Sequence, residues 1–170
     1  LQDANVSLSS GSYVGVGALV GRVGGATEIR DCGVSGSVST SSSSALYVGG
    51  LVGYVYEKTT VDGCYGAASV TGGSYSSGKV GGLIGYTYSA ADVSNCYVTG
   101  EVTSKGAAAG ALGYFSTSSS NKVTLTNCYA ACDVGGSAGY RYPFAYIYSN
   151  YLTATNCLYE SGRESNKDNT

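Results

Sequence analysis

Two carboxylates have a spacing that could support hydrolytic chemistry. Glu101 and Asp133 each occupy the fifth position after a cysteine, and both cysteines belong to the same recurring series, at Cys96 and Cys128. If residues at this spacing stack on neighbouring parallel strands, their backbones lie about 4.8 Å apart. Such a pair is compatible with a retaining glycosidase or with a calcium site. Ser37 and Ser69 hold the same position in the preceding sequence, which favours an outward, solvated face over a cleft.

The composition excludes several other kinds of chemistry. The chain contains no histidine, so it cannot assemble a Ser–His–Asp or Cys–His arrangement or a histidine-bearing zinc site, and it has no CxxC pair. We therefore expect no enzymatic activity, no cofactor and no metal site. The formal net charge is −2 with 12% charged residues, which argues against a nucleic-acid partner. No run of about 18 apolar residues is present, so we expect no membrane insertion.

Five of the six cysteines recur at a regular interval. Cys32, Cys64, Cys96 and Cys128 are evenly spaced, and Cys157 follows at a slightly shorter interval. Stacking at this interval would bring neighbouring Cα atoms within the window of about 4.4–6.8 Å that a disulfide needs, for example in Cys32–Cys64 and Cys96–Cys128 pairs. The alternative is a column of reduced, buried thiols, which parallel neighbours pointing the same way favour. The sixth, Cys132, is a candidate for an unpaired thiol or a contact with Cys157.

Tyrosines are the most prominent candidate binding residues. Three of the regularly spaced cysteines, which we call the ladder cysteines, are each followed directly by a tyrosine: Tyr65, Tyr97 and Tyr129. Because neighbouring residues of a strand point to opposite faces, these tyrosines face outward if the cysteines face inward. An exposed aromatic stripe is a plausible surface for glycans or partner proteins. Alternatively, the rings stack on one another and cover a glycine-rich strand. A second group of tyrosines could likewise form either an exposed binding stripe or a structural stack. It comprises Tyr54, Tyr86, Tyr114 and Tyr146, followed two residues later by Tyr56, Tyr88 and Tyr148.

A repeating unit must position all of these side chains. A valine ladder at Val6, Val38, Val70, Val102 and Val134 shares the period of the cysteines. The phrases GALVG, GGLVG and GGLIG keep that period from Gly17, whereas AGALG arrives four residues early at Ala109. RYPFAYIY at 141–148 is a degenerate fifth copy, in which AYIY aligns with GYVY at 53–56. Asp, Asn or Gly precedes each ladder cysteine, which predicts a bend with positive φ.

A unit of this length cannot bury its own apolar face, but stacked copies can. We therefore predict an all-β fold, a parallel β-solenoid or β-helix of about five coils with a repeat of roughly 32 residues. The solenoid is expected to occupy residues 1–160 as a single domain. Residues 161–170 are expected to form a polar, disordered tail.

The phrase GGLVGY followed by NCYVTGEVT resembles the GLUG repeat, and the likeness extends from about Val6 to Tyr159. The first copy departs from the pattern at Arg22 and Gly33, where other copies have tyrosine. GLUG repeats occur in large extracellular bacterial proteins, including adhesin-like proteins and noncatalytic regions of IgA-cleaving peptidases. The resemblance implies a secreted or cell-surface protein with a β-solenoid region. We expect a noncatalytic adhesion or spacer module with flanking domains, which would bind glycans or host or microbial surface proteins through the exposed tyrosines. The alternative is a carbohydrate-active β-helix enzyme that uses Glu101 and Asp133.

Overall fold

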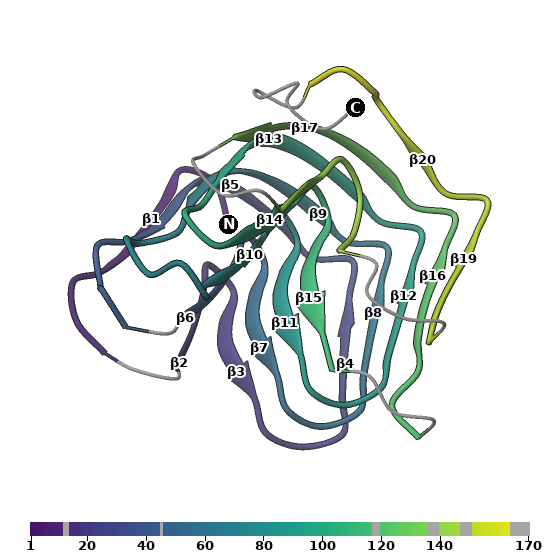
Figure 1. Ribbon diagram of the computed structural model, residues 1–170. Coiled ribbons are helices and arrows are strands. Elements are labelled where there is room, and N and C mark those ends of the chain that lie inside the picture. The colour runs from purple at the N-terminus through teal and green to yellow at the C-terminus, as the bar shows by residue number, and fades with distance from the viewer. Residues whose placement is uncertain (12–13, 45, 117–119, 136–139, 147–150, 164–170) are drawn as a thin grey trace.

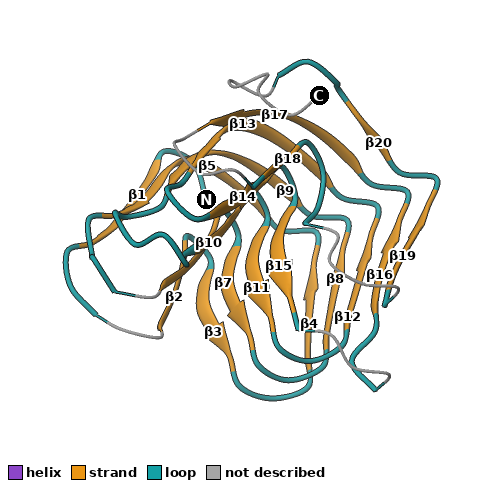
Figure 2. Cartoon of the chain, viewed as in Figure 1, coloured by secondary structure: helices purple, strands orange, loops and turns teal. Residues whose placement is uncertain are grey.

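Successive repeats of the chain wind into coils that lie one above another, and every strand pairing is parallel (Figure 1). The computed structural model describes residues 1–11, 14–44, 46–116, 120–135, 140–146 and 151–163. This part of the chain contains strands and no α-helix (Figure 2). It accordingly contains no helical segment that is long and apolar enough to cross a membrane. The predicted all-β parallel solenoid is confirmed, with about four complete coils.

Four parallel sheets run along the solenoid, and each complete coil contributes one strand to each of them. Sheet A contains β1 (Ala4–Leu8), β5 (Gly33–Thr40), β9 (Tyr65–Thr71), β13 (Tyr97–Thr103), β17 (Tyr129–Gly135) and β20 (Leu158–Tyr159). Sheet B contains β2 (Val14–Gly17), β6 (Leu46–Gly49), β10 (Lys79–Gly81), β14 (Ala107–Ala109) and β18 (Arg141–Tyr142). Sheet C contains β3 (Val20–Val23), β7 (Val52–Val55), β11 (Ile84–Thr87) and β15 (Leu112–Phe115). Sheet D contains β4 (Thr27–Arg30), β8 (Thr59–Asp62), β12 (Ala91–Ser94), β16 (Val123–Thr126) and β19 (Leu152–Thr155).

The valine ladder forms the centre of the shared core. Neighbouring strands of sheet A pair Val6 with Val38, and the pairing continues through Val70 and Val102 to Val134. All of these valines except the terminal Val6 are completely buried. A β-branched side chain packs well against its copy one strand away. Each coil therefore closes the interior of the next, as the repeat predicts.

The bend between sheets D and A uses the residue before each ladder cysteine. Asp31, Asn95, Asn127 and Asn156 have φ between 50° and 53°, and Gly63 holds the same place with φ 64°. Asparagine and aspartate tolerate this left-handed conformation better than other residues with a side chain. The amide of Asn127 donates to Oδ1 of Asn95 at 3.1 Å, and the amide of Asn95 donates to Oδ1 of Asp62 at 2.8 Å. The corner is thus a hydrogen-bonded ladder, and the predicted positive-φ bend is confirmed.

The glycine-rich phrase lies where sheets B and C fold tightly against each other. In the third coil, VGGLIGY passes from β10 through a bend into β11. A Cβ atom at Gly85 would lie 2.6 Å from the backbone nitrogen of Val48 and 2.7 Å from the carbonyl oxygen of Gly53. Only glycine permits this approach of two backbones. The phrase therefore recurs because each coil repeats the same tight crossing.

The last coil departs from the predicted alignment by one residue. Ala145 forms a bridge with Leu112, whereas the sequence alignment places it beside Gly113. The shift is already present in sheet B, where Ala108 pairs with Arg141 and not with Tyr140. Tyr148 and residues 164–170 lie outside the described residues. Arg163 follows the predicted end of the domain at residue 160, yet it contacts sheet A. Its carbonyl accepts a hydrogen bond from the N–H of Val134 at 3.0 Å.

Candidate functional site

Glu101 and Asp133 are paired neighbours on sheet A, at the register that their spacing predicts. Both side chains are exposed. Arg163 donates to both carboxylate oxygens of Asp133, from Nε at 2.8 Å and from Nη2 at 3.3 Å. These hydrogen bonds hold the pKa of Asp133 below its ordinary value. A glycosidase acid instead needs a raised pKa, so the environment of Asp133 suits a surface ion pair and not a proton donor.

The ladder cysteines line the corner between sheets D and A, and all six cysteines of the chain are free thiols. Cys64, Cys96 and Cys128 are buried, whereas Cys32 and Cys157 at the ends are partly exposed. The Cys96 thiol donates to the carbonyl of Ser94 at 3.0 Å. Cys132 is buried, and its thiol donates to the carbonyl of Gly110 at 3.5 Å. Burial raises the pKa of Cys132 to about 12, which makes this thiol a weak nucleophile.

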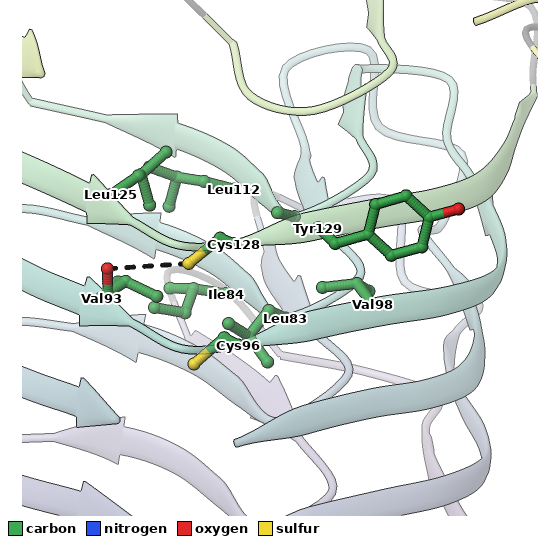
Figure 3. Close-up of a pocket in the computed structure, with 10 residues that line it drawn as sticks. Leu83, Ile84, Val93, Cys96, Val98, Leu112, Leu125, Cys128 and Tyr129 are labelled. Carbon is green, nitrogen blue, oxygen red and sulfur yellow. Dashed lines mark hydrogen bonds between the residues drawn. The ribbon is translucent and has the colours of Figure 1, made fainter. Parts of the chain in front are cut away.

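A small apolar cavity lies beside Cys96 and Cys128 inside the third and fourth coils (Figure 3). Its volume is about 10 Å³, which is barely enough for one water molecule. Leu83 lines it next to Ala111, which occupies the position that is leucine in the three preceding coils. Among the described residues, no cluster of three His, Cys, Asp or Glu side chains is placed to hold a metal ion. This cavity is therefore a packing gap in the core that is too small for an organic ligand.

The predicted stripe on sheet A is only partly continuous. The rings of Tyr65 and Tyr97 stack with centroids 5.1 Å apart and planes 7° apart, and the ring of Tyr65 fills the space that a side chain at Gly33 would need. Tyr129 continues the backbone pairing, but its hydroxyl donates to the carboxylate of Glu160 at 2.6 Å. The three residues thus share one face, while the third is engaged in a polar network.

A larger aromatic surface covers sheets B and C, where the second tyrosine group converges. Tyr54, Tyr86 and Tyr114 follow one another on successive coils, with ring centroids 5.4 Å and 5.7 Å apart. Tyr47 reaches this row from sheet B, and its centroid lies 4.9 Å from Tyr54 and 4.5 Å from Tyr86. We call this set the tyrosine–cation surface; it comprises Arg22, Tyr47, Tyr54, Tyr56, Lys79, Tyr86, Tyr88, Tyr114 and Tyr146.

Two cations lie against these rings. The guanidinium of Arg22 is 4.5 Å from the ring centroid of Tyr56, and the ammonium of Lys79 is 4.4 Å from that of Tyr114. Both distances are within cation–π range. The salt bridges of the described residues involve Arg30, Lys58 and Arg163, and neither Arg22 nor Lys79. Burial lowers the pKa of Lys79, because no carboxylate in the described part of the chain offsets its loss of hydration.

Burial in this surface also raises the pKa of Tyr86 to about 12 from an ordinary value of 10. The folded protein therefore keeps this phenolic proton at pH values where the unfolded chain has lost it. The free energy of unfolding should be insensitive to this group below about pH 10 and should decrease as the pH rises toward 12. Tyr86→Phe should remove the highest phenolate step in an ultraviolet titration and weaken the alkaline loss of stability. Tyr97→Phe is the matched control, and an unchanged highest step in Tyr86→Phe would contradict the assignment.

The sequence identified most tyrosines of this surface but not its cations. The ladders of the repeat contain Tyr54, Tyr86 and Tyr114, whereas Tyr47 and Lys79 occupy a sheet B ladder that they share with Gly15 and Ala107. Their approach to the tyrosines depends on the angle between sheets B and C, which no spacing specifies. The sequence did contain one indication of a cation beside the tyrosines. Arg22 stands where later copies have tyrosine, and it pairs with Tyr54 on the neighbouring strand.

Comparison with known families agrees with the repeat. The family model of the GLUG motif matches residues 12–39 and 76–103. Each matched segment spans the four strands of one coil in the order sheet B, C, D and A, namely β2 to β5, apart from the last residue of β5, and β10 to β13. The predicted resemblance is confirmed for these two segments, and one motif corresponds to one turn of the solenoid. No curated protein and no solved structure matches the chain significantly.

Proposed function

We propose that this GLUG-repeat solenoid is a noncatalytic binding module of a larger extracellular bacterial protein, and that it holds a glycan on the tyrosine–cation surface. The observation that carries the proposal is the convergence of tyrosines from two sheets on one face, with Tyr56 and Tyr88 exposed by 39% and 47%. Tyrosine offers an apolar ring and a polar hydroxyl at once, which suits sugar recognition. Stacking of the rings over the glycine-rich strands accounts for their buried parts, whereas the exposed parts of Tyr56 and Tyr88 are available to a ligand.

Binding to a glycan array, followed by titration of the best ligand, tests the proposal. The double variant Tyr56→Ala/Tyr88→Ala should lose binding while its circular dichroism spectrum and melting temperature stay close to those of the original protein. Tyr65→Ala/Tyr97→Ala, which removes a stacked pair from sheet A, is the matched control and should keep the affinity. Loss of binding in the sheet A variant alone would transfer the site to Tyr65, Tyr97 and Tyr129. Absence of binding to any glycan, or equal binding by all variants, would contradict the proposal.

The noncatalytic part of the proposal has its own test. Incubation with polysaccharides should release no reducing ends, and Glu101→Gln should behave like the original protein. The ion pair between Asp133 and Arg163 supports this expectation. Turnover that disappears in Glu101→Gln would establish the alternative of a carbohydrate-active enzyme.

A further inference from the structure

Charged residues are segregated between the faces of the solenoid. The strands of sheets B and C contain three cations, Arg22, Lys79 and Arg141, and no aspartate or glutamate. The strands of sheets A and D contain five carboxylates and one cation; these are Glu28, Arg30, Asp62, Asp92, Glu101 and Asp133. The protein carries a net charge of −2, so two sheets whose strands carry only positive charges differ from the rest of the molecule.

The two cations of the tyrosine–cation surface are placed for an external anion. Arg22 contacts Tyr54, the first ring of the row, and Lys79 contacts Tyr114, the third. Lys79 is half-buried, and a cation that loses hydration without gaining a carboxylate carries a cost that an anionic ligand would remove. Arg22 offers a planar fork of donors that matches carboxylate or sulfate groups.

The regular spacing favours a polymer over a single small anion. Equivalent tyrosines recur once per coil, about 4.8 Å apart along the solenoid axis. A polysaccharide with a regular repeat, running along the axis, would meet the same groups at each coil and a cation at more than one of them. We propose, building on the function proposed above, that the tyrosine–cation surface binds an acidic polysaccharide, with Arg22 and Lys79 pairing with its carboxylate or sulfate groups.

Three polymers with one backbone test this assignment directly. Neutral dextran, carboxymethyl-dextran and dextran sulfate are compared by isothermal titration calorimetry at low and physiological salt. The acidic polymers should bind roughly tenfold more tightly than dextran, and the difference should shrink as salt rises. A preference between them identifies carboxylate or sulfate as the recognised group. Poly-L-glutamate is the fourth probe, and tighter binding of this polypeptide would overturn the assignment to a polysaccharide.

Charge-matched variants locate the effect. Arg22→Gln and Lys79→Gln should each weaken binding of the acidic polymers roughly 3- to 10-fold and leave dextran unaffected. Arg30→Gln and Lys58→Gln remove the same charge near sheet D and should leave all affinities within about twofold. Equal losses in all four variants, or equal affinity for the neutral and acidic dextrans, would overturn the inference. If array glycans bind through Tyr56 and Tyr88 without this charge preference, the inference fails and the proposed function stands; if no glycan binds, both fail.

Discussion

Gly85→Ala will lower the free energy of unfolding by about 3 kcal/mol, because the added methyl group enters a space that other backbones occupy. Its Cβ would lie 2.6 Å from the nitrogen of Val48 and 2.7 Å from the carbonyl oxygen of Gly53. Neither atom can move away easily, since both belong to paired strands of the neighbouring coil. Chemical denaturation followed by circular dichroism measures the change.

Gly25→Ala is the matched control for this prediction. No heavy atom lies within 4 Å of a Cβ built at Gly25, and its backbone does not have a positive φ. Its stability should change by no more than about 0.5 kcal/mol. If Gly85→Ala is as stable as Gly25→Ala, sheets B and C do not approach each other as described.

Leu83→Ala should also destabilise the protein, by about 3 kcal/mol. Leu83 is 2% exposed and already borders the 10 Å³ cavity beside Ala111. Truncation of the side chain enlarges that cavity by the volume of the removed atoms. The core cannot collapse into the enlarged cavity, because the strands on both sides are held by their pairing with neighbouring coils. Equilibrium denaturation in urea measures the loss.

Leu158→Ala is the control that makes the same chemical change on the surface. Leu158 is 68% exposed, so its truncation should change stability by no more than about 0.5 kcal/mol. Similar small effects from both leucine variants would mean that the coils do not share a closed interior.

The sequence predicts the stacking of the coils because residues at equal spacing occupy equivalent positions in successive coils. The valines of sheet A and the polar residues before the cysteines each play one role in every coil, so a single spacing reveals both the core and the corner. The same logic predicted the neighbourhood of Glu101 and Asp133. The ion pair of Asp133 with Arg163 could not be predicted in this way. Arg163 stands six residues after Cys157, where the earlier coils have a buried valine, so the repeat predicts an apolar residue there and not a cation.

The candidate site depends on geometry between sheets, which repeats do not encode. The contact of Tyr47 with Tyr54 joins two strands of the same coil, across a bend whose angle is set by the glycine crossing. The one-residue shift of the last coil was also not predictable from the repeat. Ala145 stands where earlier coils have glycine, and it pairs with Leu112.

Stacking of the coils in register gathers the tyrosines into one surface. Nuclear Overhauser spectroscopy on a deuterated protein with protonated tyrosine rings measures this arrangement, with assignments from single Tyr→Phe variants. We expect cross-peaks for Tyr54–Tyr86, Tyr86–Tyr114 and Tyr56–Tyr88, and for Tyr47 with both Tyr54 and Tyr86. A folded protein without cross-peaks between equivalent rings of successive coils would contradict the in-register stacking.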